Sequence, residues 1–379
     1  MTKLPKIFTL RHPPFEYRHS GLYCPELMID LTETESELVA QLFDVLDDAI
    51  DSLPEIDDSY ANKTKIQKLL YFAIDEFEIP VTHSWYLAGA VVPDRSIGPD
   101  ALQTVDGPEG PSSPSVPEID SDVDSADLGT VDPILFTESS NLEPDSEPSS
   151  GLSTYVSRSD LLTFYRQEIP NLWHERTMRF LQNFYQETAP EEYRLLYIES
   201  THLRTHLADL ADAIDSVIAG ESPKRSISSI RESIELSISD LHYYIGRHDN
   251  LSQTFDVVVE GTNIIEDAVM RLDQHEPTNL TSEHRTAIER LQDFFYYYVW
   301  KYPCLLISAD TASGPQADDL RAEQLAIFES FDDRVLEERA TVATGLASVD
   351  LLPGPNDYEP IDDDVLSERL RNLSTQYLK

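Results

Sequence analysis

The stretch from Pro190 to Tyr302 constrains the fold most, because it carries sustained periodic spacing of apolar residues. Apolar residues recur at steps of three, four or seven positions from Leu196 to Val217. After a break at residues 220–223, the same rhythm continues from Ile227 to Ile245. Residues three or four positions apart share one face of an α-helix, so each segment predicts an amphipathic helix that packs lengthwise on a neighbour.

The same reasoning predicts a series of helices along most of the chain. Short connections between consecutive helices make them antiparallel neighbours, which predicts a C-terminal antiparallel helical bundle. A segment with Trp85 and Tyr86, at 81–92, predicts a short strand or buried turn. The fold class is therefore mainly α. The expected helices cover residues 33–51, 62–77, 159–169, 170–187, 190–219, 226–245, 252–275, 282–301, 317–343 and 365–378.

Composition divides the chain into four parts. Residues 1–92 predict a small helical N-terminal domain. Residues 93–154 contain nine prolines and 14 acidic residues against one basic residue, which predicts a disordered acidic linker rich in Pro and Ser. Residues 155–305 form the expected helical bundle, and 306–379 supply C-terminal helices and an acidic tail that pack on it.

Acidic residues outnumber basic residues by 70 to 28, which gives a net charge of −42. The excess is spread along the chain, since the four parts carry −9, −13, −10 and −10. At molar salt the Debye length is about 3 Å, so such a surface is screened from its own repulsion. An ordinary acidic protein more often concentrates its charge in blocks. The composition predicts a halophilic cytoplasm with inorganic cations as counterions, and argues against nucleic-acid binding, which needs basic patches.

Compartment signals agree with this expectation. The first ten residues lack the apolar core of a signal peptide, and no apolar run approaches the roughly 18 residues of a membrane span. Cys24 and Cys304 lie far apart and lack metal-ligand spacing, which predicts two reduced, buried thiols. We therefore expect a cytoplasmic protein without a membrane partner.

Glu199, His202 and His206 are the residues that most resemble a metal site. Their spacing of i, i+3 and i+7 places them on one face of a helix, as in helical-bundle metal sites. A second Glu-x-x-His element is missing, so Glu199 and His202 can equally form a simple pair beside the apolar stripe. Phosphate-binding loops and nucleophile elbows are also missing from the sequence. We therefore assign no catalytic residue, metal ligand or cofactor.

Two groups of residues are candidates for partner contact. Three of the eight lysines, Lys63, Lys65 and Lys68, fall within six residues near the start of the helix at 62–77. They either pair with the acidic helix at 33–51 or contact a partner. An aromatic run at 294–298 is followed by Trp300, and Tyr and Trp are enriched in interface cores. Its surplus residues, Tyr296, Tyr297, Trp300 and Tyr302, contact either a partner or the helix at 317–343.

The segment Thr64 to Ala73, with the sequence TKIQKLLYFA, resembles the opening helix of the Panacea, or SocA-like, domain family. His83 to Gly89 occupies the place of the apolar, aromatic-containing segment that follows in that family. The resemblance covers residues 62–92, and Val92-Pro93 stands where the family has a Gly-Pro motif. It implies an antitoxin or proteolytic adaptor that binds protein without catalysis. For such an interaction module we expect Tyr71 to contact the partner beside the three lysines.

Three functions remain open from the sequence. The first is a non-catalytic protein–protein interaction module, antitoxin-like or adaptor-like, whose partner is another protein. The second is a structural or assembly subunit, of a virus or mobile element, that self-associates through its bundle. The third is a metal-dependent enzyme that uses the face of Glu199, His202 and His206.

Overall fold

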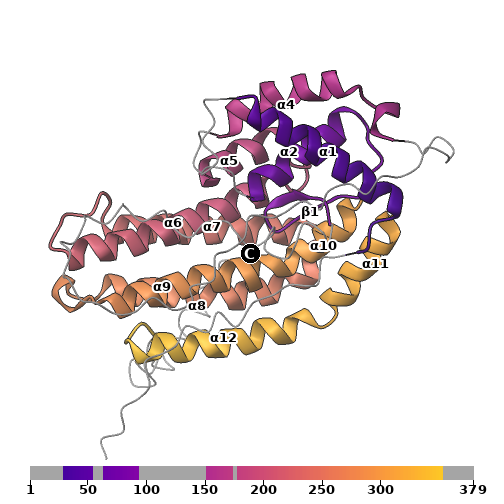
Figure 1. Cartoon of the computed structure of the whole chain (residues 1–379). Coiled ribbons are helices and arrows are strands. Elements are labelled where there is room, and N and C mark those ends of the chain that lie inside the picture. Colours follow the sequence, from indigo (N-terminus) through magenta and orange to yellow (C-terminus); the bar gives the residue numbers. More distant parts are fainter. Residues whose placement is uncertain (1–28, 54–62, 94–150, 174–176, 353–379) are drawn as a thin grey trace, which may run out of the picture.

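The computed structural model describes residues 29–53, 63–93, 151–173 and 177–352. These residues form a mainly helical fold with one two-stranded sheet (Figure 1). The predicted mainly α class with a C-terminal bundle is thus confirmed. The N-terminal segment, most of the expected linker and the helix expected at 365–378 lie outside the described residues.

Long helices form the body of the fold and lie alongside one another (Figure 1). Each buries the apolar stripe that its sequence predicts; in α6 the stripe includes Leu203, Leu207, Leu210 and Ile214. Gly220 follows α6 with a φ of 74°, a left-handed conformation that glycine adopts without steric cost. The long helices are α6 (Arg194–Ile218), α7 (Ile227–Arg247), α8 (Phe255–Asp273), α9 (Ser282–Phe294) and α12 (Phe331–Ser348).

A smaller layer of helices and a hairpin covers one end of this bundle (Figure 1). Thr32 caps the first helix, because its hydroxyl accepts from the Glu35 N–H while the Glu35 carboxylate accepts from Thr32. In the antiparallel hairpin Trp85 pairs with Ala90. The layer comprises α1 (Glu33–Asp51), α2 (Lys63–Glu76), β1 (Ser84–Tyr86), β2 (Gly89–Val91), the short 3₁₀ helix η4 (Leu152–Thr154), α4 (Arg158–Trp173) and α5 (Thr177–Thr188).

Two helix boundaries expected at prolines are wrong. Helix α4 continues through Pro170 to Trp173, because a proline in the last turn removes only one hydrogen bond. Pro303 lies in the first turn of the next helix, directly after a π-helical segment, so the helix does not end before it. The segment predicted as one helix at 282–301 is α9, the π-helical segment η7 (Phe295–Trp300) and the start of α10 (Lys301–Thr311).

Further short elements connect the long helices. The predicted helix at 252–275 begins as the 3₁₀ helix η5 (Asp249–Thr254) before α8, and η6 (Pro277–Asn279) follows α8. The helix expected at 317–343 is divided into α11 (Ala317–Phe328) and α12, which extends to Ser348. Figure 1 shows α12 along the outer side of the bundle, where it packs on α8 and α9.

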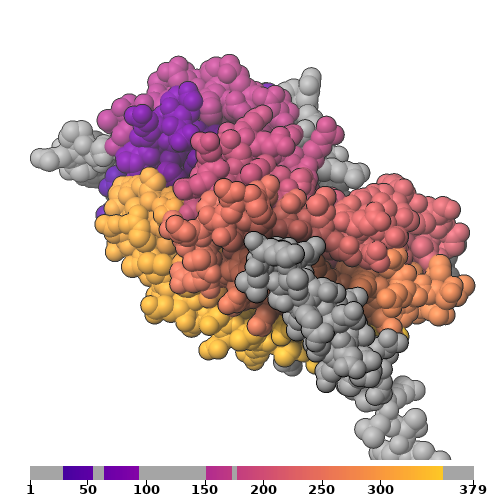
Figure 2. Space-filling view, turned by 180° about the vertical axis from the view of Figure 1, so that it is seen from behind, coloured from indigo at the N-terminus to yellow at the C-terminus, as the bar shows by residue number. Residues whose placement is uncertain are grey.

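One hydrophobic core joins the small layer to the bundle within the described residues. It runs from Leu38 in α1 to Leu351 after α12. His83 and Ser313 form a backbone bridge between the chain before β1 and the loop before α11. Seen from behind, the N-terminal layer adjoins the bundle directly (Figure 2). The boundary drawn at residue 92 therefore does not separate two cores.

Candidate functional site

The lysines expected to contact a partner lie in the interior. Lys65 and Lys68 are buried, because α1, α4 and β2 surround α2 and leave it no broad solvent face. Lys63 begins α2, but its side chain is not among those that the structure describes. The proposed exposed lysine surface is thus wrong for Lys65 and Lys68.

Lys68 is held by backbone and aromatic groups. Its Nζ donates to the carbonyl of Ala90 at 2.5 Å and lies 5.4 Å from the centre of the Phe184 ring. Burial lowers the pKa of Lys68 from 10.5 to about 7. Since Ala90 belongs to β2 and Phe184 to α5, this one side chain joins three elements of the small layer.

Aromatic rings surround Trp85 beside Lys68. The Trp85 ring stacks on Phe184 with centroids 5.3 Å apart, and Tyr197 of α6 meets it edge-on at 5.4 Å. Tyr71, which was predicted to contact a partner together with the lysines, is buried with its ring 5.9 Å from Trp85. Tyr71 is therefore a packing residue here, and not an exposed contact.

Tyr197 and Trp300 hold the hairpin turn by hydrogen bonds. The Tyr197 hydroxyl donates to the carbonyl of Tyr86 at 2.8 Å. The Trp300 indole donates to the carbonyl of Leu87 at 3.1 Å. Buried turn carbonyls need such donors, because water cannot reach them. Trp300 is therefore buried for a structural reason, which corrects its assignment as a partner contact.

The rest of the aromatic run packs against the C-terminal helices. Tyr302 stacks on Phe328 of α11 with centroids 4.6 Å apart, and Tyr298 stacks on Phe331 of α12 at 6.4 Å. The alternative that the surplus residues of this run contact the helix expected at 317–343 is thus confirmed for Tyr302. Tyr296 is buried, which corrects its proposed exposure, and partner contact through the half-buried Tyr297 stays a prediction.

The expected metal-site face contains a single ion pair. His202 Nδ1 lies 3.3 Å from a carboxylate oxygen of Glu199, and this contact raises the pKa of His202. Burial lowers the pKa of His206, whose ring centroid is 6.3 Å from that of His202. Within the described parts of the chain, no three His, Cys, Asp or Glu side chains group closely enough to hold a metal ion. The geometry is that of a pair beside the apolar stripe.

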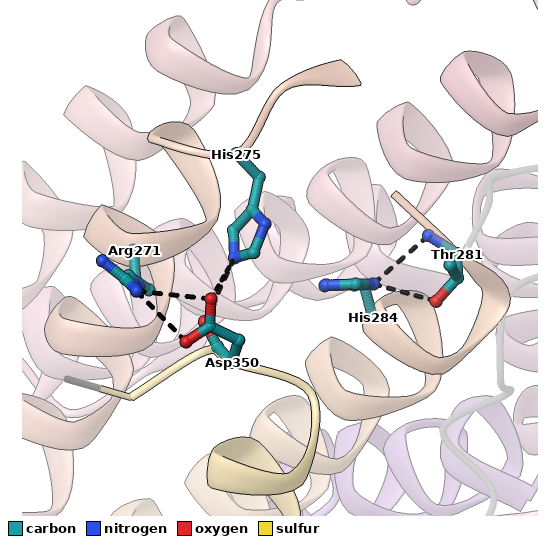
Figure 3. Close-up of polar contacts among 5 residues, drawn as sticks. All are labelled: Arg271, His275, Thr281, His284 and Asp350. Carbon is teal, nitrogen blue, oxygen red and sulfur yellow. Dashed lines mark hydrogen bonds and ion pairs between the residues drawn. The ribbon is translucent and has the colours of Figure 1, made fainter. Parts of the chain in front are cut away.

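A second histidine cluster fastens the end of α12 (Figure 3). Arg271 of α8 donates to both carboxylate oxygens of Asp350 at 3.1 and 3.3 Å. His275 contacts the Asp350 carbonyl at 3.1 Å, while His284 Nδ1 accepts from the N–H of Thr281 at 3.2 Å. Burial, followed by the nearby His275, lowers the pKa of His284. The cluster works as a structural clamp between α8, α9 and the chain after α12.

The outward face of α7 exposes two large apolar side chains. Leu236 is 63% exposed and Tyr243 is 56% exposed, and their spacing of seven places them on one side of the helix. Ser239 lies exposed between them, and the Arg247 guanidinium is 5.3 Å from the Tyr243 ring. We call these four residues the α7 surface. The sequence signal was Leu236, which is out of phase with the buried stripe of isoleucines.

Comparison with known proteins places the chain in a family. Residues 28–379 match the family model described as domain of unknown function DUF8098. The chain belongs to this family. No curated protein and no solved structure matches it. None of the helices that the structure describes combines the length and apolar composition of a membrane span.

The structure contains one further site, around Glu35 of α1, that the sequence analysis did not predict. The buried Glu35 carboxylate accepts from the Thr82 N–H at 2.9 Å and from the Thr82 hydroxyl at 2.6 Å. Its other oxygen accepts from Gln316 Nε2 at 2.8 Å and from Thr32. Burial raises the pKa of Glu35, but these donors outweigh it and the net shift is downward. An acidic residue among many in the sequence gave no sign of this role.

Proposed function

We propose that the chain is a non-catalytic protein-binding module, adaptor-like or antitoxin-like, of a halophilic cytoplasm. The observation that carries the proposal is the exposure of Leu236 and Tyr243 on α7. Large apolar side chains grouped on a surface are a mark of contact sites, and Tyr and Arg recur among the residues that dominate binding energy. Tyr243 and Arg247 supply both types, side by side.

The α7 surface fits an amphipathic helix as its partner. Its exposed residues follow helical spacing, and the small residues Ser239 and Gly246 let a second helix approach closely. Glu232 and Glu235 lie exposed beside Leu236, so a partner with basic residues flanking its apolar stripe matches the charge. In molar salt the apolar contact carries most of the affinity, because charge pairs are screened.

Two sequence features support the same class of function. The resemblance of residues 62–92 to the Panacea family points to a protein-binding antitoxin or adaptor. The net charge of −42 supports a salt-rich cytoplasm, in which inorganic cations accompany the carboxylates. Burial of Lys65, Lys68 and Tyr71 moves the proposed contact away from that helix and onto α7.

The test is affinity purification of tagged chain from lysate in molar KCl. We expect wild type to capture a defined partner, and the double variant Leu236→Asp, Tyr243→Asp to lose at least about 90% of it, which corresponds to more than about 1.4 kcal/mol. Leu336→Asp is the matched control, because Leu336 is an exposed leucine of α12, with 44% exposure. It should leave capture unchanged.

Light scattering of the same variants distinguishes the protein-binding module from the alternative, a self-associating assembly subunit. A homo-oligomer of wild type that the double substitution dissociates would favour the assembly subunit. Unchanged capture of the same partner by the double variant would contradict the proposed surface.

A further inference from the structure

Arg204 of α6 is a buried cation without a counter-charge among the described residues. The residue is 6% exposed, and no acceptor lies within hydrogen-bonding geometry of its Nε. No described carboxylate forms an ion pair with its guanidinium. Four other arginines with an enclosed Nε each have such a carboxylate: Arg231 with Asp273 at 2.8 Å, Arg271 with Asp350 at 3.1 Å, Arg285 with Asp215 at 2.7 Å and Arg339 with Glu260 at 3.9 Å.

The Arg204 guanidinium lies over the ring of Tyr296 in η7. Its central carbon is 3.6 Å from the ring centre, so the two planar groups are in contact. The Tyr296 hydroxyl is itself enclosed and has no hydrogen-bond partner in the described structure. Two unsatisfied donors therefore lie together between α6 and η7.

The surrounding groups keep both donors available. Burial raises the pKa of Tyr296 and outweighs the lowering effect of the guanidinium, so the phenol stays protonated. Burial also raises the pKa of Tyr185, which faces the same guanidinium from α5. The hydroxyls of Ser200 and Thr201, one turn before Arg204, are committed to the Tyr197 carbonyl at 2.9 and 3.0 Å. They do not satisfy the charge.

A buried guanidinium is unfavourable unless an anion compensates it. Carboxylates are not scarce in this chain, which has 70 of them, yet none of those described pairs with Arg204. The cluster consists of N–H and O–H donors enclosed by aromatic rings. This chemistry suits a small spherical anion, which accepts hydrogen bonds from any direction and needs little space.

We propose that Arg204 and Tyr296 bind a chloride ion between α6 and the π-helical segment η7. Chloride neutralises the guanidinium and accepts from the Arg204 Nε and the Tyr296 hydroxyl. Weak affinity is sufficient in a salt-rich host, because stabilisation grows with the ratio of ligand concentration to Kd. The ion then links the long helix α6 to the aromatic segment that supports the hairpin.

The first test is thermal melting in KCl and in potassium gluconate at equal ionic strength. Both salts screen surface charge, but gluconate is too large to reach an enclosed side chain. We expect wild type to melt about 2–4 °C higher in chloride. Arg204→Met should lose this chloride-specific increment and should be at least as stable as wild type in gluconate, since it removes an uncompensated charge. Tyr296→Phe should reduce the increment.

Arg231→Met is the matched control, because Arg231 already has its carboxylate. It should keep the increment. The second test uses wild type alone: crystals grown in bromide should give an anomalous peak within hydrogen-bonding distance of Arg204 Nε. Equal melting of wild type in the two salts, or bromide bound elsewhere and not at Arg204, would overturn the proposal.

Discussion

Burial makes Lys68 a pH-sensitive part of the core. Its pKa is about 7 in the folded chain, against an ordinary value of 10.5. Between these values the unfolded chain binds a proton at this position that the folded chain releases. Stability therefore rises with pH through this window, by at most about 1.4 kcal/mol per pH unit for one group. Below pH 7 both states bind the proton and the dependence disappears.

We expect Lys68→Met to remove this pH dependence. Methionine keeps most of the length of the side chain without the charge, so the variant should be more stable than wild type at pH 6, and the difference should shrink toward pH 9. Denaturant unfolding from pH 6 to 9 measures it. Lys224→Met, at an exposed lysine, is the control and should follow wild type. A parallel pH profile for wild type and Lys68→Met would contradict the assignment.

At the scale of elements, the positions of the helices could be predicted from the sequence, but which of their faces are buried could not always be predicted. Helix positions followed from the sequence because apolar spacing is local, as in the stripe of α6. The faces of α2 did not, because Lys68 is buried by Ala90 and Phe184, which belong to other elements. Local sequence carries no record of such neighbours. The same holds for Trp300. The tyrosines next to it in the sequence predicted a partner-contact surface, but its buried indole donates a hydrogen bond to the hairpin turn.

Glu35 connects elements that are distant in the chain, since its carboxylate holds Thr82 before β1 and Gln316 before α11. We expect Glu35→Gln to lower the free energy of unfolding by about 2 kcal/mol at pH 7, because an amide N–H₂ would then face a buried donor. The folded pKa of Glu35 is lowered, so its stabilisation is fully present above the ordinary value of 4.5 and is lost as pH falls through the folded value. The difference between the variant and wild type should therefore shrink in acid.

Denaturant titrations at pH 7 and pH 3.5 measure this. Glu37→Gln, at an exposed position two residues further along α1, should match wild type within about 0.5 kcal/mol. A deficit of Glu35→Gln that is the same at both pH values would mean that the carboxylate charge is not what stabilises the junction.

At the scale of the whole molecule, a continuous core is surrounded by like charges. Burial, with Asp209 and Asp215 nearby, raises the pKa of Asp212. Burial and neighbouring carboxylates likewise raise the pKa values of Glu168 and Glu266. These shifts show that the folded chain brings carboxylates together at a cost in electrostatic free energy. The sequence predicted this cost from its net charge, because total charge does not depend on which residues become neighbours.

We expect the fold to loosen when salt falls below about 0.5 M, because the Debye length then grows beyond the spacing of neighbouring carboxylates. Melting temperature and near-ultraviolet circular dichroism from 0.1 to about 3 M KCl measure it. Sorbitol at matched osmolality is the control, since it favours compact states without screening charge. If sorbitol restores the fold as well as KCl does, or if melting does not change with salt, repulsion among the carboxylates does not limit stability. The rise in melting temperature that KCl and potassium gluconate share measures the screening of surface charge. Any additional rise in KCl measures the chloride-specific effect at Arg204.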